Sequence, residues 1–258
     1  MIGVIDSGSG GVNVILECMK YYNEDYVFLV DNKNCPYGNK NPKLLKEILT
    51  NNVNYLTNNY DLDLIILACN TISALVDYKI MLENKVPILK TIPHIKEIKK
   101  NWKNILIFAT KNTLNNNKEI KLLRLNYPQI KSLYIKDIPK DIDEYLSRES
   151  NKSLEKINKK LNKYLLLNKF KNINIVVLGC THFKYIKNNI QQNIDNDIKF
   201  FDCEERVAKI SKWLVRKNKK LNTIKIVLTQ EDEDLQNTII KRLGISDHEC
   251  LNFCTKVK

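Results

Sequence analysis

Two cysteines stand at matching places in two similar stretches of the chain. Residues 61–71 read DLDLIILACNT and residues 172–182 read NINIVVLGCTH, so an apolar run ends in Cys69 or Cys180 in each. A lone cysteine at the end of a buried strand is usually only a small apolar residue. A strand-to-helix turn, however, offers free backbone N–H groups and the positive end of a helix dipole, which stabilise a thiolate. The repeated setting therefore favours a functional role for both thiols.

Two opposed thiols could invert a stereocentre. One thiolate removes a proton from one face of a carbon, and the other group, as a thiol, returns a proton to the opposite face. Cysteine suits this role because its ordinary pKa of about 8.5 can be tuned toward neutrality. A metal site is the weaker interpretation, because Cys180-x-His182 and His248-x-Cys250 lack the recurring ligand spacing of a structural zinc site. We therefore expect no metal.

Polar residues beside these cysteines could complete a site. Residues 6–11 read DSGSGG, a glycine-rich turn that could bind an anion but is neither G-x-G-x-x-G nor a Walker A motif. Asp6 either caps this turn or assists an acid/base, and Ser7 could hold a substrate group. The hydrogen-bonding residues after Cys69 are either helix caps or substrate ligands; they are Asn70, Thr71 and Ser73. His182 could tune the Cys180 thiol or be an ordinary loop histidine.

Short apolar runs alternate with amphipathic stretches along the chain, which predicts an α/β fold. The runs are apolar throughout rather than alternating, as in parallel strands covered on both faces. The predicted strands are residues 2–5, 27–30, 62–68, 105–109, 173–178 and 224–228.

The internal similarity extends to the first strand, because residues 2–7 resemble residues 105–110. Such a repeat predicts two similar doubly wound parallel-sheet domains related by pseudo-twofold symmetry. Ligands of open parallel sheets bind beyond the carboxyl ends of the strands. The two halves would therefore place Cys69 and Cys180 on opposite walls of one cleft, which is the predicted active site.

Composition and charge exclude several classes of protein. The chain has 258 residues, of which 43% are hydrophobic, so it is globular rather than disordered. The net charge is +13, but the basic residues are scattered, with short clusters at 96–100, 159–160 and 216–220 and no interleaved aromatic residues. We therefore expect no nucleic-acid partner. No apolar run approaches the ~18 residues of a membrane span, and no basic, apolar leader precedes the first predicted strand. We expect a cytoplasmic protein whose seven cysteines are reduced.

Four segments together resemble the glutamate racemase family, within the cofactor-independent aspartate/glutamate racemase superfamily. They match in order and spacing across roughly residues 2–210. The segments are IGVIDSGSGG at 2–11, CPYG at 35–38, ACNT at 68–71 and LGCTH at 178–182.

The resemblance implies that Cys69 and Cys180 are the acid/base pair, with Asp6 assisting Cys69 and His182 assisting Cys180. It also implies a small acidic amino acid as substrate, no cofactor, and an assembly that could be a homodimer. The implied substrate contacts are Asp6, Ser7, Tyr37, Gly38, Asn70, Thr71, Thr181 and His182. The implied domains are 1–91, completed by 205–258, and 92–204, with the chain returning to its first domain near its end.

One departure from the family pattern concerns the side of His182. The family usually has a Cys-Pro segment leading to a Glu that supports this histidine, whereas residues 136–144 read KDIPKDIDE. Asp143 and Glu144 are the two candidates for that role. The remaining cysteines, including Cys35 and Cys203, are interpreted as structural.

The predicted function is cofactor-independent interconversion of L- and D-glutamate, supplying D-glutamate for peptidoglycan. An aspartate racemase is one alternative, which the CPYG segment disfavours. A family member retained only as a binding protein is the other, and the intact Cys69 and Cys180 argue against it.

Overall fold

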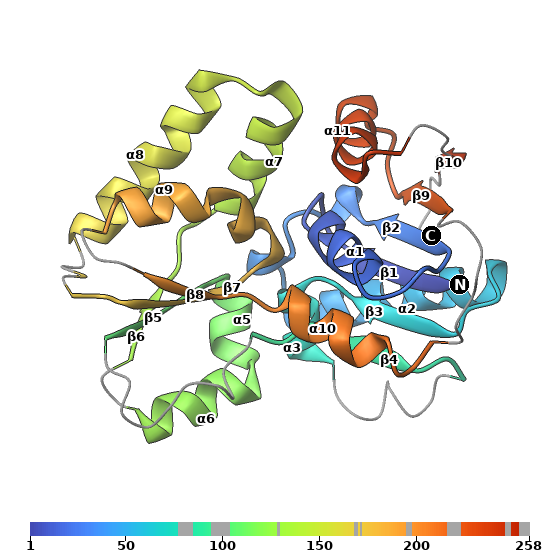
Figure 1. The fold of residues 1–258 in the computed structure, drawn as a ribbon, viewed down its shortest axis with the longest axis horizontal. Coiled ribbons are helices and arrows are strands. Elements are labelled where there is room, and N and C mark those ends of the chain that lie inside the picture. Colours follow the sequence, from blue (N-terminus) through green and yellow to red (C-terminus); the bar gives the residue numbers. More distant parts are fainter. Residues whose placement is uncertain are drawn as a thin grey trace.

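The computed structural model describes residues 1–76, 85–93, 104–127, 130–167, 170, 172–194, 198–215, 223–245 and 249–252. Two parallel sheets lie side by side in this part of the chain (Figure 1). Three features used in the sequence analysis lie outside the described residues: His248 and the basic clusters at 96–100 and 216–220.

The first sheet has the strand order β10-β9-β2-β1-β3-β4, and every neighbouring pair is parallel. The three central strands are apolar and buried along nearly their whole length because helices cover both faces of the sheet. The strands are β1 (Ile2–Asp6), β2 (Tyr26–Val30), β3 (Leu64–Leu67), β4 (Ile88–Lys90), β9 (Ile224–Leu228) and β10 (Glu249–Asn252).

The second sheet has the strand order β6-β5-β7-β8, also parallel throughout. This order repeats β2-β1-β3-β4 of the first sheet, so β1 corresponds to β5 and β3 to β7, as the internal similarity predicts. The α/β class with two parallel sheets is thereby confirmed. The strands are β5 (Ile105–Ala109), β6 (Lys131–Leu133), β7 (Ile175–Gly179) and β8 (Lys199–Phe201).

Helices cover both faces of the first sheet. Core side chains of one strand alternate between two clusters: Val4 packs with α1, α10 and α11, whereas Ile5 packs with α2 and α3. These helices are α1 (Gly11–Met19), α2 (Pro42–Asn59), α3 (Asn70–Leu75), α10 (Glu204–Ser211) and α11 (Glu233–Leu243). Two short 3-10 turns, η1 (Asn32–Asn34) and η2 (Tyr37–Asn39), follow β2.

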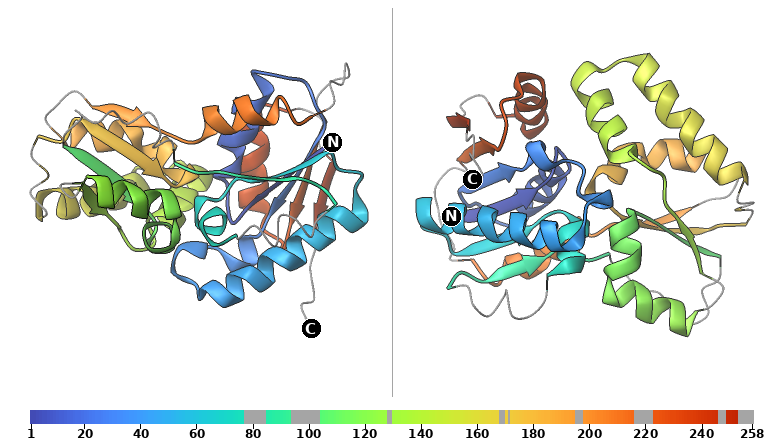
Figure 2. Two further views of the ribbon diagram at one scale, coloured as in Figure 1. Left: turned by 90° about the horizontal axis from the view of Figure 1, so that it is seen from below. Right: turned by 180° about the vertical axis from the view of Figure 1, so that it is seen from behind.

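The second sheet is covered in the same way, with α7, α8 and α9 on one face and α5 and α6 on the other (Figures 1 and 2). Its helices are α5 (Lys111–Asn116), α6 (Lys118–Asn126), α7 (Ile138–Arg148), α8 (Asn151–Leu167) and α9 (Lys187–Gln192), with the 3-10 segment η3 (Thr181–Ile186) after β7.

The end of the described chain returns to the first sheet, where β9 pairs with β2 and β10 with β9. Helix α11 from this return also packs against α7 of the second half. The boundaries 1–91, 92–204 and 205–258 stay a prediction. None of the helices in the described ranges has the length and apolar character needed to cross a membrane.

Candidate active site

Cys69 and Cys180 occupy equivalent places in the two halves. Cys69 follows β3 and is the N-cap residue of α3, while Cys180 follows β7 and is the N-cap residue of η3. Both side chains are almost fully buried, at 7% and 8% exposure. Burial raises the pKa of Cys69, and negative charge on Asp6 and on Cys180 raises it further, while backbone N–H groups of Ile72 and Thr71 lower it. The two thiols therefore lie within electrostatic reach of each other.

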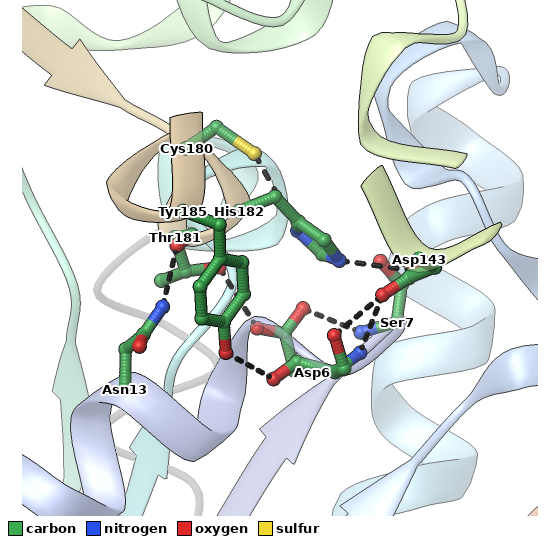
Figure 3. A network of polar contacts seen from close by, with 9 residues as sticks. Asp6, Ser7, Asn13, Asp143, Cys180, Thr181, His182 and Tyr185 are labelled. Atoms are coloured by element: carbon green, nitrogen blue, oxygen red, sulfur yellow. Dashed lines mark hydrogen bonds and ion pairs between the residues drawn. The ribbon is translucent and has the colours of Figure 1, made fainter. Parts of the chain in front are cut away.

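A chain of contacts runs from the Cys180 sulfur to a carboxylate (Figure 3). The Cys180 Sγ lies 3.7 Å from His182 Nδ1, and His182 Nε2 lies 3.1 Å from Asp143 Oδ2. Asp143 comes from α7, and its other oxygen accepts hydrogen bonds from the hydroxyl (2.5 Å) and backbone N–H (3.3 Å) of Ser9. Of the two candidates left open by the sequence, the structure therefore places Asp143 beside the histidine. Glu144 instead lies 3.1 Å from the Lys156 ammonium at the surface.

The His182–Asp143 contact is an ion pair. Burial disfavours charge on His182, but the Asp143 carboxylate outweighs it and holds the pKa of the imidazole well above its ordinary value. Burial likewise opposes ionisation of Asp143, yet His182 and Ser9 keep the pKa of that carboxyl below its ordinary value. A protonated His182 has an N–H on each ring nitrogen, one for Asp143 and one directed at the Cys180 sulfur.

Asp6 lies at the end of β1 and is completely buried. One carboxylate oxygen accepts the Ser7 backbone N–H at 2.6 Å, and the other accepts the Thr181 hydroxyl at 3.0 Å. Burial raises the pKa of Asp6, although the positive charge of His182 opposes this. Asp6 therefore joins the first sheet to η3 of the second and adds a negative charge near Cys69.

The two halves approach each other closely at the glycine-rich turn. A Cβ on Gly10 would lie 2.3 Å from the Thr181 hydroxyl oxygen and 2.8 Å from His182 Nδ1. A Cβ on Gly8 would lie 2.5 Å from an Asp143 carboxylate oxygen. These glycines are thus needed for close packing. In this turn, the backbone N–H of Ser7 donates to the Asp6 carboxylate and that of Ser9 donates to the Asp143 carboxylate. Both of these N–H groups therefore bind carboxylates of the chain itself.

Two further side chains close this side of the site. The Asn13 amide on α1 donates to the Thr181 carbonyl at 2.9 Å, and the Tyr185 hydroxyl donates to the Ser9 carbonyl at 3.3 Å (Figure 3). Neither Asn13 nor Tyr185 was singled out from the sequence. Tyr185 lies one turn beyond His182 in η3, so the spacing alone could have indicated it.

The polar residues after Cys69 have different partners. The Asn70 amide nitrogen lies 3.3 Å from Cys203 Sγ, while its carbonyl oxygen is buried with no partner among the described residues. The Thr71 hydroxyl lies 2.8 Å from the Thr110 hydroxyl of the other half. The Ser73 hydroxyl donates to the backbone of β3 and accepts the N–H that follows β4, so it is structural.

Tyr37 and Gly38 lie on the first-sheet side of the interface between the halves. The Tyr37 hydroxyl donates to Asp31 at 2.5 Å inside a buried polar cluster, and its carbonyl accepts the Asn112 amide at 3.1 Å. Gly38 packs against Thr110, where a Cβ would lie 2.9 Å from that side chain. The Tyr37 hydroxyl is already bonded to Asp31, and Gly38 has no side chain. A substrate contact at these two residues would therefore use their backbone groups, and it stays a prediction.

A cavity of about 530 Å³ opens beside Asp143. Its lining includes Ser7 from the β1 turn and Asp143, Lys140 and Arg148 from α7. Cys35, which the sequence analysis interprets as structural, also lines this cavity, and burial raises its pKa to about 12. Within the described ranges, no three His, Cys, Asp or Glu side chains are grouped so that they could hold a metal ion.

No family model matches the chain. The glutamate racemase of Clostridium novyi (strain NT) is 32% identical over 256 residues, which cover 95% of this chain and 97% of that protein. The chain belongs to the glutamate racemase family. Solved structures agree with this family in fold. The glutamate racemase isoform RacE1 from Bacillus anthracis matches with a TM-score of 0.83, at 22% identity and over 99% of this chain and 98% of that one. The glutamate racemase from Francisella tularensis subsp. tularensis SCHU S4 matches with a TM-score of 0.78, at 24% identity over 97% and 96%.

Membership of the glutamate racemase family confirms the resemblance carried by the four segments. The structure also shows which predicted residues lie together: Asp6 bonds to Thr181, and His182, the next residue in the chain, contacts Asp143. These contacts extend to residues that single motifs do not reveal, because Ser9, Asn13 and Asp143 meet their partners only across the two halves.

Proposed function

We propose that this member of the glutamate racemase family interconverts L- and D-glutamate by two-thiol acid/base catalysis without a cofactor. The observation that carries the proposal is the equivalent placement of two buried thiols, Cys69 after β3 and Cys180 after β7, near enough for charge on Cys180 to raise the pKa of Cys69. The resulting D-glutamate would serve peptidoglycan synthesis.

The proton balance of this reaction needs only the two sulfurs. One thiolate takes the α-proton of the amino acid and becomes a thiol, leaving a carbanion at the α-carbon. The other thiol gives its proton to the opposite face of that carbon and becomes a thiolate. The product is the mirror image of the substrate, and the two sulfurs have exchanged protonation states, so the reverse reaction restores them.

The surroundings of the two sulfurs differ, which supports separate roles. Burial and the Asp6 charge raise the pKa of Cys69, which favours Cys69 as the proton donor for one of the two enantiomers. Cys180 would then be the base for that enantiomer, because the protonated His182 directs an N–H at its sulfur, and Asp143 holds that proton in place. Ser7, Asn70, Thr71 and Thr181 would bind the ammonium and carboxylate groups of the substrate.

Glutamate is the proposed substrate because the whole-length relative from Clostridium novyi is a glutamate racemase. The Francisella tularensis racemase was solved in complex with D-glutamate, which supports an acidic amino acid as the ligand here too.

Circular dichroism of each enantiomer of glutamate and aspartate tests the proposal directly. The protein is first dialysed against a chelator, and no pyridoxal phosphate is added. Glutamate should racemise, aspartate should racemise more slowly, and Cys69→Ala and Cys180→Ala should abolish the reaction. Cys18→Ala is the matched control, because Cys18 is a buried thiol in the first core, far along the chain from both motifs. Faster turnover of aspartate would instead favour the aspartate racemase alternative, and glutamate binding without turnover would favour a binding protein.

A further inference from the structure

Cys203 lies directly behind the candidate substrate residue Asn70. Its sulfur is 3.3 Å from the Asn70 amide nitrogen, and both side chains are only 1% exposed. Cys203 is the N-cap residue of α10, a helix that follows β8 of the second sheet yet packs against α1 of the first. The contact therefore links the turn after Cys69 to the segment that joins the two halves.

The other end of the same amide is an acceptor without a partner. The Asn70 carbonyl oxygen is buried and has no hydrogen bond to any described residue. Buried carbonyl oxygens are nearly always paired, because an unpaired one costs about 1–3 kcal/mol. An amino-acid ligand carries a donor that could pair with it, namely the α-ammonium group with its three N–H bonds.

In the structure, the Asn70 amide turns its nitrogen toward the Cys203 sulfur. A side-chain amide can be turned by half a rotation, which exchanges its oxygen and nitrogen. With Cys203 Sγ accepting an N–H on one side, the oxygen is left on the other side. The Cys203 backbone N–H in turn donates to Glu204 Oε2 at 3.0 Å, which ties the start of α10 in place.

We propose that Cys203 is a positioning residue for the amino-acid site, which holds the Asn70 amide so that its carbonyl oxygen is free to accept the substrate ammonium group. This inference rests on the proposed function, since it needs an amino acid as the ligand. Because the hydrogen bond of Cys203 goes to Asn70, we expect it to act on binding and to leave the proton transfers to Cys69 and Cys180.

Two crossed substitutions separate hydrogen bonding from packing at this position. Cys203→Ser keeps an acceptor but reduces volume, whereas Cys203→Val keeps volume but removes the acceptor. A positioning role predicts that Val raises KM for glutamate about five- to tenfold with kcat little changed, whereas Ser leaves KM close to wild type. A packing role predicts the reverse order. Cys18→Val, at another buried thiol, is the matched control and should leave KM unchanged.

A double-mutant cycle shows whether the effect passes through Asn70. The Val substitution should raise KM in the wild-type background and add nothing in an Asn70→Ala background, because the amide that it positions is gone. Thermal melting confirms that each variant folds, and Cys203→Ala replaces the Val variant if that one does not. An active wild type with equal KM in the Val and Ser variants overturns this inference alone. A wild type that neither binds nor racemises any acidic amino acid overturns the proposed function, and this inference with it.

Discussion

The Asp143 carboxylate lies 3.1 Å from His182 Nε2 and so connects helix α7 to the Cys180 side of the site. Its charge raises the pKa of His182 against the opposing effect of burial. The same carboxylate accepts two hydrogen bonds from Ser9, which belongs to the first half of the chain. Asp143 therefore serves both the electrostatics of the histidine and the closure of the two halves.

Asp143→Asn should lower the pKa of His182 and slow racemisation, because a neutral amide no longer stabilises the imidazolium. The expected loss in kcat is about 10- to 100-fold, less than the roughly 10²- to 10⁴-fold that an acid/base group itself contributes, because Asp143 acts through His182. An NMR titration of the His182 ring gives the pKa, and circular dichroism with glutamate gives the rate.

Glu144→Gln is the matched control, since Glu144 is the next residue and pairs with Lys156 at the surface. It should leave both the His182 titration and the rate unchanged. Equal effects of the two substitutions would mean that the general charge of α7 matters and the contact with His182 does not.

Gly10→Ala should inactivate the site through steric overlap, although alanine can adopt the backbone conformation of Gly10. Gly10 has φ −57° and ψ −33°, which alanine adopts readily. Any loss of activity would therefore come from steric overlap of the added methyl group and not from backbone strain. The added methyl group would meet the Thr181 hydroxyl at 2.3 Å and His182 at 2.8 Å. We expect kcat/KM to fall at least about 100-fold, as is typical when catalytic groups are displaced by about 1 Å.

Gly244→Asn provides the comparison for that experiment. Gly244 has φ +65°, which asparagine tolerates, and a Cβ there would meet nothing within 4 Å. Its kcat/KM should match wild type. Normal activity of the Gly10→Ala variant would show that the two halves do not approach this closely in the working enzyme.

The sequence predicted the inner strands and missed the edges. β1, β2, β3, β5, β7 and β9 are buried apolar runs, and each was predicted to within about two residues. The strands β4, β6, β8 and β10 were missed. They have three or four residues each, and β6 (KSL) and β8 (KFF) begin with an exposed lysine. Such short segments carry too little periodicity to be told from loops, and only pairing with an inner strand orders them.

The site residues differ in the same way. Those that stand in local sequence motifs were predicted, whereas those that depend on long-range contacts were not. Cys69, Cys180 and His182 stand in motifs whose residues are neighbours in the chain, so their types and spacing pointed to them. Asp143 became one of two candidates only because residues 136–144 stand where the family has a Glu that supports the histidine. Its contact with Ser9, 134 residues away, depends on how the halves pack. Cys203 was interpreted as structural because nothing next to it in the sequence indicates that it meets Asn70.

Glu204→Gln should change how stability depends on pH. Burial, together with the negative charge of the neighbouring Asp202, raises the pKa of Glu204 to about 7. Between its ordinary pKa of 4.5 and about 7, the folded protein binds more protons than the unfolded chain, so the free energy of unfolding falls as pH rises. Glutamine lacks this titration but keeps an oxygen for the Cys203 N–H. Relative to wild type, the variant should gain about 1–3 kcal/mol between pH 5 and pH 8.

Urea unfolding at pH 5 and pH 8 measures this difference. Glu205→Gln is the control, because Glu205 is the next residue and its side chain is half-exposed. Its effect on the free energy of unfolding should be nearly the same at both pH values. A Glu204→Gln variant with no gain at pH 8 would mean that the Glu204 charge is already compensated, for example by Lys184, whose positive charge lowers the pKa of Glu204.

The two thiols should prefer opposite enantiomers in a half-reaction. Racemisation itself cannot show this, because its equilibrium constant is one and kcat/KM must therefore be equal in both directions. Elimination from a 3-chloro analogue of glutamate needs only one base. A thiolate takes the α-proton, chloride leaves with its electron pair, and the enamine hydrolyses to 2-oxoglutarate and ammonia. Cys69→Ser and Cys180→Ser should each lose racemisation, because a serine hydroxyl is far too weak an acid to replace a thiol.

Each serine variant keeps one thiol, so each should still eliminate chloride from one enantiomer of the analogue and fail on the other. The preferences should be opposite, since Cys69 and Cys180 would face opposite sides of the α-carbon. Release of 2-oxoglutarate, followed with a coupled dehydrogenase, measures both. The wild type should eliminate from both enantiomers. If the two variants instead preferred the same enantiomer, both sulfurs would lie on one face of the substrate, and the equivalence of the β3 and β7 strand ends would then have no catalytic meaning.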